Sequence, residues 1–500
     1  MALIDLPVEI QQRIIFYLPS IKDLAALSTQ CRALHSLCDM NQRRKYGQVR
    51  VSSDTGHLDA SFDVLMDILR RPSVGYYVSH LEYRAKVPLG VDYCEKEHQR
   101  QITASDMQLL CRATGRAGFT GAQEKQVINM LLRRTDARYS KEDNAETYLA
   151  QALAALLISV SPNLCSMAMA PTSFRDANCE FPLDWLLRQV NEQLHDKLYL
   201  QNLRTVYIIN ESDELPGYER EYARMDFLRC LKVIKDLPSI ELVGTDLLEE
   251  DRNGEKELEP RSANFSRVVI HHSWVSSRYI IKLVRSCRIL REFQYSIGGR
   301  FPNWHNPDRD HSGFILNALM RVMIIHRDTL EVLDMDLESH IYPFGYYSSD
   351  ATRQQGFNQD ESQYGDNELE PDSPLRKLEG SLKDFSAMKK LSLSISVLMY
   401  WAKGVNGDVS MKGTLVDNLP PRLEYLCVRG YKRGEFPDYD THIDSLLESM
   451  RQGLIGLKEV YGVDQVIPHA LDVHWPDQQP YLLWKGRDDD FRLMSGMPMD

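Results

Sequence analysis

A six-residue unit of the form apolar-x-x-apolar-x-apolar recurs along most of the chain and constrains the fold more than any other feature. Its last two apolar positions lie two residues apart, so on a β-strand both side chains point to the same face. Each unit therefore predicts a short strand that turns one face inward. Ten segments fit the pattern, the last only in part: residues 78–83, 164–169, 203–208, 237–242, 265–270, 290–295, 330–335, 388–393, 423–428 and 457–460.

Amphipathic helical stretches separate the strand units. One apolar stripe at helical spacing consists of Leu228, Leu231, Ile234 and Leu237. No single unit can bury its own apolar face, so neighbouring units must stack, which is the physical signature of leucine-rich repeats. The starts at 203, 237, 265 and 290 are 34, 28 and 25 residues apart, whereas regular repeats run about 20–29 residues. We therefore expect an irregular, leucine-rich-repeat-like α/β solenoid; the alternative is a plain α/β domain whose strands alternate with helices.

Three stretches interrupt the repeating pattern. Residues 93–141 are polar and charged, with one helical piece near 127–132, and residues 249–260 form a charged loop. Residues 342–374 are rich in Gly, Ser, Gln, Asp and Tyr, a composition typical of a mobile insertion. We predict four regions: a helical module at 1–46, a helical lead-in with the first repeat-like strand and the charged insertion at 47–160, the repeat-like domain at 161–465, and a C-terminal tail at 466–500.

Composition argues against several classes of partner. The net charge of −12 argues against a nucleic acid as the main partner, because a protein that binds the phosphate backbone needs concentrated Lys and Arg. It weakly favours a basic protein target. No membrane is expected, because the longest apolar stretch, residues 150–160, is shorter than the about 20 residues of a spanning helix. The nine cysteines include no CxxC pair, and Asp5 and Glu9 interrupt the N-terminal apolar run that a signal peptide would need. We therefore expect reduced thiols in a cytoplasmic or nuclear protein.

The sequence carries few signs of catalytic chemistry. It contains no G-x-S-x-G nucleophile elbow, no P-loop, no H-E-x-x-H and no dinucleotide-binding fingerprint. His271 and His272, close to Trp274, are adjacent on an expected strand and would point to opposite faces. A second polar cluster, whose spacing matches no metal template, consists of His305, Asp308, Asp310 and His311. We therefore predict a protein that is not an enzyme, with no catalytic residue, no metal ligand and no cofactor.

The first 46 residues predict three short helices. Pro7 suits the first position of a helix, Glu9 complements the helix dipole, and Pro19 ends that helix before Ser20 caps the next. Three such helices bury too little surface to be very stable alone, so some apolar positions are expected to await a partner. The alternative is an ordinary helical cap on a larger domain.

The residues of this segment resemble the F-box motif. The matching positions, in the motif's order and at its spacing, are Leu6-Pro7-Val8-Glu9-Ile10, Ile14, Leu18, Asp23-Leu24, Leu27, Ser28 and Cys31-Arg32. The family's aromatic residue near the end of the motif is missing, since residues 33–38 hold none. The resemblance implies that one set of residues serves in the helical core or in the interface with a Skp-type adaptor: Leu6, Pro7, Ile10, Ile14, Leu18, Leu24 and Leu27.

F-box proteins often combine the box with leucine-rich repeats, and the chain resembles that combination, particularly as found in fungi. The resemblance implies a non-catalytic substrate-recognition subunit of an SCF-type ubiquitin ligase, which binds the adaptor, through it a cullin–RING ligase, and through its repeats a protein target. One alternative is an F-box scaffold that acts without a cullin, and another is an enzyme with a helical N-terminal cap. Aromatic residues that are either target anchors or packing residues are Tyr346, Tyr347, Trp401, Tyr431 and Trp484.

Overall fold

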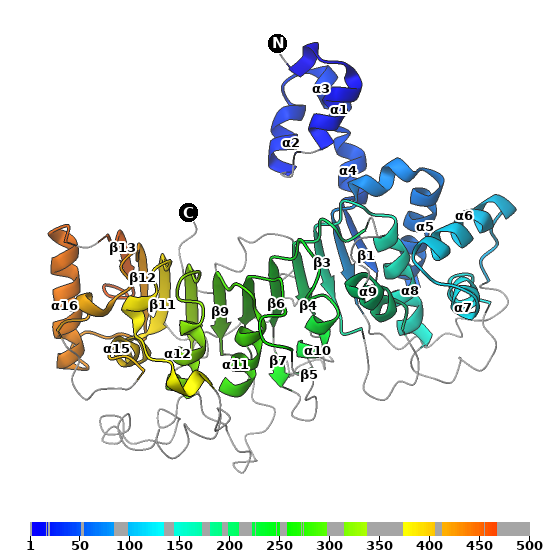
Figure 1. Ribbon diagram of the computed structural model, residues 1–500. Coiled ribbons are helices and arrows are strands. Elements are labelled where there is room, and N and C mark those ends of the chain that lie inside the picture. The colour runs from blue at the N-terminus through cyan, green and yellow to red at the C-terminus, as the bar shows by residue number, and fades with distance from the viewer. Residues whose placement is uncertain are drawn as a thin grey trace. The chain divides into compact units, whose positions relative to one another are not determined.

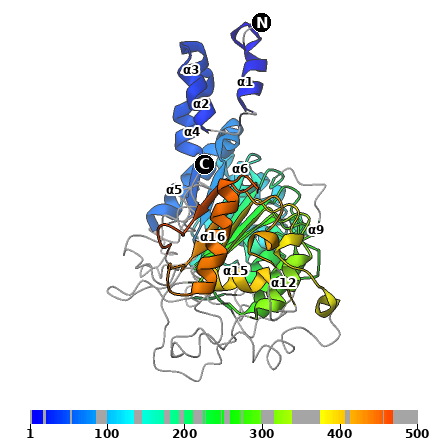
Figure 2. The same ribbon diagram turned by 90° about the vertical axis from the view of Figure 1, so that its left-hand side faces the viewer.

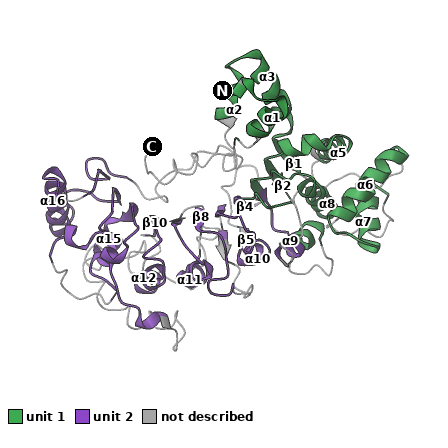
Figure 3. Ribbon diagram, turned by 45° about the horizontal axis from the view of Figure 1, so that its top comes forward, with its two compact units in different colours: residues 1–167, 178–186, 195–203 green, residues 168–177, 187–194, 204–500 purple. Residues whose placement is uncertain are grey.

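The computed structural model (Figure 1) describes residues 3–16, 18, 21–51, 55–84, 99–134, 145–172, 181–192, 199–209, 223–225, 227–246, 248–250, 258–271, 273, 275–297, 315–337, 374–405, 413–454 and 456–467. The chain forms two compact units (Figure 3). Unit 1 comprises residues 1–167, 178–186 and 195–203, and unit 2 comprises residues 168–177, 187–194 and 204–500.

Unit 1 begins with a small group of helices, gathered at the N-terminal end in Figures 1 and 2. The elements are η1 (Leu3–Asp5), α1 (Val8–Phe16), α2 (Ile21–Ser28), α3 (Arg32–Cys38) and α4 (Met40–Tyr46). The three predicted helices are present, and a left-handed residue, Asp39 with φ 46°, turns the chain into the fourth. Ile15, Leu24, Leu34 and Cys38 form a separate hydrophobic core for this group.

The remainder of unit 1 contains two paired strands and several helices. The elements are β1 (Gln48–Val51), α5 (Thr55–Arg70), η2 (Pro72–Tyr77), β2 (His80–Tyr83), α6 (Ala104–Arg116), α7 (Ala122–Leu131) and α8 (Ala145–Ser159). β1 and β2 are parallel, with Val49 opposite Leu81. The sequence did not predict β1, and α6 and α7 add helix to a stretch where one helical piece was expected. The units meet in sequence within β3 (Ser166–Met169) and α9 (Pro182–Glu192).

Unit 2 contains a long parallel sheet, which confirms the predicted α/β class. Each strand is hydrogen-bonded to the next in chain order: β4 (Thr205–Ile208), β6 (Leu242–Asp246), β8 (Arg267–His271), β9 (Glu292–Ser296), β10 (Val332–Asp336), β11 (Lys390–Ser394), β12 (Tyr425–Arg429) and β13 (Glu459–Tyr461). A separate pair is formed by β5 (Ala223–Met225) and β7 (Leu248–Glu250). Parallel pairing requires a crossover between strands, and helices supply most of the crossovers.

The helices α10, α11, α12 and α15 follow one face of this sheet (Figure 1). The helical elements of unit 2 are α10 (Phe227–Lys232), α11 (Ser277–Ser286), α12 (Leu316–Ile324), η5 (Pro374–Lys377), η6 (Leu382–Asp384), α15 (Ile395–Ala402), η7 (Val416–Asn418) and α16 (Pro437–Arg451). One apolar residue of each strand lies in a single row across the sheet: Val206, Val243, Val268, Phe293, Leu333, Leu391, Leu426 and Val460. Seven of these eight are fully buried and form the core.

The sheet register corrects one predicted unit. The strand expected within residues 237–242 begins at Leu242, and Val206 pairs with Val243 and Ile208 with Thr245. The unit therefore starts at Ile240, and the starts at 203, 240, 265 and 290 are 37, 25 and 25 residues apart. Thr245 occupies the last apolar position because its hydroxyl donates to Ile208 O at 3.0 Å. A hydrogen-bonded threonine replaces the apolar side chain that the pattern required.

Several predicted features lie wholly or partly outside the described residues. The insertion at 342–374 is outside them apart from Pro374, the tail is outside them after Ile467, and the loop at 249–260 is described only at its two ends. Within the described residues, no helix is long and apolar enough to cross a membrane.

Candidate binding surfaces

Helix α1 leaves apolar side chains in solvent. Val8, Ile10 and Ile14 are 47 %, 43 % and 39 % exposed, and they are three of the seven large hydrophobic residues that are exposed among the described residues. Ile10 and Ile14 are four residues apart and so share one side of the helix. Ile15 instead enters the helical core. We call the exposed side formed by Pro7, Ile10 and Ile14 the α1 surface.

The seven residues predicted for the F-box divide between this surface and the core beneath it. Leu24 is buried in the core, and Leu18 and Leu27 are partly buried against it. Pro7, Ile10 and Ile14 are exposed, and Leu6 is half-buried. The carbonyl of Leu6 accepts a hydrogen bond from Gln11 Nε2 at 2.6 Å, which holds the start of α1.

Buried polar contacts tie the N-terminal helices to the rest of unit 1. The hydroxyl of the fully buried Tyr46 donates to Asp67 Oδ2 at 2.8 Å and accepts from Arg71 Nη2 at 3.1 Å. The hydrogen bond from Tyr46 is the main cause that lowers the pKa of Asp67. Nearby, Tyr77 donates to Asp39 Oδ2 at 3.1 Å, and the guanidinium of Arg43 lies 5.0 Å from the Tyr77 ring. These contacts fix α4 on α5 and η2.

The sheet face opposite the buried row in unit 2 carries polar side chains, and we call it the polar face. It is defined in β8 to β12 by Arg267, Glu292, Gln294, Asp334, Asp336, Ser392 and Arg429. These residues alternate with the core row along each strand, so their side chains leave the opposite side of the sheet. All except Arg267 are buried. Buried polar groups require partners, so the hydrogen bonds of this face decide what it can do.

Two hydrogen-bonded groups make up the polar face. Arg267 Nε donates to Glu292 Oε2 at 2.6 Å, and Gln294 Nε2 donates to Glu292 Oε1 at 2.5 Å. Arg429 Nη2 donates to Asp334 Oδ1 at 3.2 Å, in an ion pair whose two side chains are each 6 % exposed. Burial raises the pKa of Asp334, although the neighbouring Arg429 opposes the shift.

The polar face becomes apolar toward β4. The ring of Tyr207 lies against Gly244 so closely that a Cβ at Gly244 would be 2.3 Å from Tyr207 Cε1. Leu242 and Val269 form a small buried cluster with Tyr207 packed on it. The face therefore combines an aromatic and aliphatic region with a charged one, a combination common in protein interfaces.

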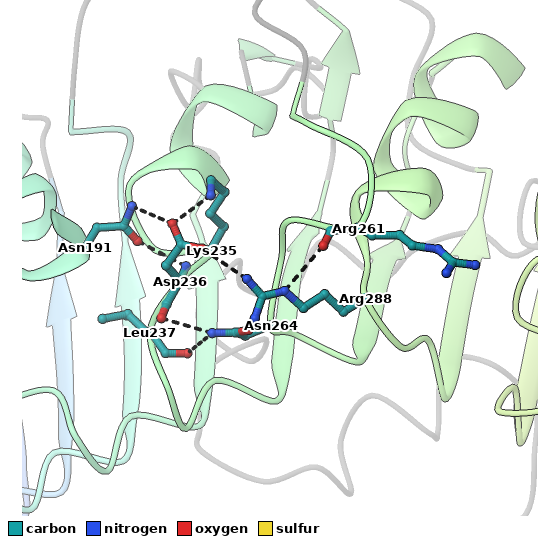
Figure 4. A network of polar contacts seen from close by, with 7 residues as sticks. All are labelled: Asn191, Lys235, Asp236, Leu237, Arg261, Asn264 and Arg288. Carbon is teal, nitrogen blue, oxygen red and sulfur yellow. Dashed lines mark hydrogen bonds and ion pairs between the residues drawn. The ribbon is translucent and has the colours of Figure 1, made fainter. Parts of the chain in front are cut away.

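A network of polar contacts at the turns before β6 and β8 is structural (Figure 4). Asn264 Nδ2 donates to Asp236 O at 3.0 Å and to Leu237 O at 3.2 Å. Arg288 donates to Asn264 Oδ1 at 2.8 Å and to Arg261 O at 3.3 Å. The network satisfies backbone carbonyls that neither helix nor sheet uses, and it therefore holds successive turns in register.

Of the two polar clusters singled out in the sequence, the structure describes only His271. His271 is buried on β8 with Nδ1 3.2 Å from Ser296 Oγ, while His272, Trp274 and the cluster at 305–311 lie outside the described residues. Among the described residues, no group of three His, Cys, Asp or Glu side chains could hold a metal ion.

Of the five aromatic residues considered as target anchors, the structure describes Trp401 and Tyr431. Trp401 is fully buried, and its Nε1 donates to Leu316 O at 3.2 Å. Tyr431 is 2 % exposed and donates to Asp440 Oδ1 at 2.6 Å. Both are packing residues, while Tyr346, Tyr347 and Trp484 lie outside the described residues.

No protein-family model and no curated protein matches the chain.

Proposed function

We propose that the chain is the substrate-recognition subunit of an SCF-type ubiquitin ligase, in which the N-terminal helices bind a Skp-type adaptor and the repeat domain binds a protein target. The observation that carries the proposal is that an F-box-like order of residues falls on a small helical group with its own core and an exposed apolar surface. In this account the chain acts in the cytoplasm or nucleus without a cofactor, a membrane or nucleic acid.

The α1 surface supports the adaptor contact. Ile10 and Ile14 remain 43 % and 39 % exposed after the helical core has formed. Burial of what remains exposed contributes about 1 kcal/mol for each residue, a fraction of the value for a whole side chain. A partner that covers both residues and Pro7 would therefore gain about 2 kcal/mol from these isoleucines. Leu24, Leu18 and Leu27 serve the helical core in this account, and they affect binding only through the shape of the module.

The parallel sheet supports the finer fold proposal, a leucine-rich-repeat-like solenoid. Its strands follow one another in chain order, and the apolar residue of each unit joins one continuous core row. Stacked units of this kind present an extended sheet face, and we assign the target to the side chains of this face that remain partly exposed, Tyr207 and Arg267. The protein would make no bond itself; it would raise the effective concentration of target beside a charged ubiquitin enzyme.

An affinity purification of the full chain from a eukaryotic lysate tests this proposal. The wild type is expected to recover the adaptor and a cullin, and both should be lost from Leu6→Ala/Pro7→Ala and from Ile10→Asp/Ile14→Asp. The matched control is Ile289→Asp/Val466→Asp, because these residues are 47 % and 44 % exposed outside the N-terminal helices.

The outcomes separate the possible functions. Adaptor without cullin would favour a scaffold that acts outside the ligase. Recovery of neither partner by a folded wild-type chain would contradict the F-box assignment, and retention of an activity after removal of the first 46 residues would favour an enzyme with a helical cap.

A further inference from the structure

The two hydrogen-bonded groups of the polar face are not joined to each other by a hydrogen bond. Arg267 and Gln294 both donate to Glu292 on one side, and Arg429 donates to Asp334 on the other. Between the two groups, Gln294 Oε1 and Asp334 Oδ2 are buried and receive no hydrogen bond. Gln294 is 6 % exposed and Asp334 is 4 % exposed. Buried polar atoms without partners are uncommon and costly, so this pair requires an explanation.

The two unbonded oxygens belong to adjacent residues of the sheet. Gln294 on β9 and Asp334 on β10 are register partners, so their side chains leave the same face of strands about 4.8 Å apart. The amide nitrogen of Gln294 is already committed to Glu292, which fixes Oε1 as the unsatisfied atom. An ionised Asp334 can only accept. Two acceptors therefore stand side by side, and one added proton would convert them into a donor and an acceptor.

The charges around Asp334 also favour a proton. The titratable and charged groups that share its face on the nearby strands are Arg267 and His271 on β8, Glu292 on β9, Asp336 on β10, Lys390 on β11, and Tyr425, Cys427 and Arg429 on β12. Glu292 is held by Arg267, and Lys390 lies 4.8 Å from the ring of Tyr425. Burial, reinforced by Asp336, raises the pKa of Asp334, while Arg429 and Ser392 act in the opposite direction.

We propose that Asp334 carries a proton in the folded protein at neutral pH and donates it to Gln294 Oε1. The proton is taken from solvent on folding, and it joins the two hydrogen-bonded groups into one chain from Arg267 to Arg429. Loss of the proton at higher pH adds one negative charge to the centre of the polar face. The inference rests on the geometry of this face and is independent of the proposed function.

The substitution Asp334→Asn tests the inference because the amide keeps the shape and supplies a permanent donor. A raised folded-state pKa means that the stabilising effect is complete below the unfolded pKa of about 3.9 and is lost as the pH rises. The folding equilibrium constant of the wild type should therefore fall about tenfold per pH unit relative to Asp334→Asn within that window. We expect the Tm of the variant minus that of the wild type to increase from pH 5 to pH 8.5.

A control variant, Asp328→Asn, and an infrared measurement complete the test. Asp328→Asn removes a carboxylate that is 76 % exposed in the turn before β10 and should show no such trend. Infrared spectroscopy of the wild type at pH 7 should show the C=O stretch of a protonated carboxyl group, absent in Asp334→Asn and shifted in Gln294→Met. A variant destabilised equally at every pH, or a wild-type spectrum without that band, would overturn the proposal and leave an ordinary ion pair with Arg429.

Discussion

His326, in the turn after α12, joins two neighbouring repeats through both nitrogens of its ring. Nδ1 accepts from the backbone N–H of Leu290 at 3.3 Å, and Nε2 donates to Val284 O at 3.1 Å. These partners require the neutral ring with its proton on Nε2. Burial is the main cause that lowers the pKa of His326, with a smaller effect from the charge of Arg261.

The substitution His326→Ala should lower the free energy of unfolding by about 1–3 kcal/mol at pH 7, because it leaves the buried N–H of Leu290 without a partner. It also removes one of the hydrogen bonds that Val284 O accepts, while the bond from the backbone N–H of Cys287 remains. The folded-state pKa is lowered, so the stabilisation is complete above the unfolded value of about 6.5 and is lost as the pH falls through the folded value. The stability difference between wild type and variant should therefore shrink on acidification. Denaturant unfolding at pH 7.5 and pH 5 measures it, and an unchanged difference would argue against this role.

Gly75 is required for close packing in unit 1. A Cβ at this position would lie 2.2 Å from the carbonyl oxygen of Val160 and 3.1 Å from Ile68 Cγ2. We expect Gly75→Ala to destabilise the protein by about 2–3 kcal/mol through overpacking. Gly115→Ala is the matched control, because Gly115 lies in α6 with no atom within 4 Å of its Cβ position and should gain about 0.5 kcal/mol of helix propensity. Thermal unfolding should show a lower Tm for Gly75→Ala and a slightly higher Tm for Gly115→Ala than for the wild type.

At the scale of elements, strand positions were predictable because the core row depends on apolar spacing. The pattern located the strands of the long sheet in unit 2 except at residues 237–242, where Leu237 precedes the strand and Thr245 takes an apolar position. It did not locate the short strands β5 and β7. It missed β1, which follows directly after α4 and falls in the region predicted as a helical lead-in. The polar face was not predictable, because its residues occupy variable positions of the pattern and Asp334 meets Arg429 from 95 residues away.

The residues that enter the strands of unit 2 alternate in charge across the sheet. Along the chain they are Arg204, Glu241, Ser266, Arg291, Glu331, Lys389, Glu424 and Lys458. Lys389 Nζ lies 2.6 Å from Glu331 Oε2, and Lys458 Nζ lies 2.6 Å from Glu424 Oε2. A slip of one strand past its neighbour would separate these opposite charges, so the ion pairs favour the observed register.

The change Lys389→Glu places like charges together at the Glu331 contact. Both side chains are partly exposed, so the expected loss is only about 0.5–1 kcal/mol at low salt. The loss should decrease near 1 M salt, where the screening length is about 3 Å. The double variant Glu331→Lys/Lys389→Glu should recover part of the stability. Urea unfolding at two salt concentrations measures these changes in the free energy of unfolding. A loss of stability that does not depend on salt and is not recovered in the double variant would rule out an electrostatic origin.

At the scale of the whole molecule, we propose that one chain has two binding roles. The resemblance selected seven N-terminal residues, but it did not separate those that reach solvent from those that form the core. The structure makes that separation: Ile10 and Ile14 are exposed, whereas Leu24 is buried. Burial depends on how α1 packs against α3, which apolar spacing within a single helix does not determine. The adaptor proposal can therefore be tested with surface residues whose replacement spares the core.

The most direct test of the central claim is calorimetric titration of the purified full chain with a purified Skp-type adaptor. Three proteins are compared: the wild type, Ile10→Ser/Ile14→Ser, and the control Ile289→Ser/Leu454→Ser, which alters two exposed apolar residues outside α1. The account predicts that the wild type and the control bind alike. The α1 variant should bind at least about 30-fold more weakly, equivalent to about 2 kcal/mol. Equal binding by all three proteins, or no binding by a folded wild-type chain, would contradict it.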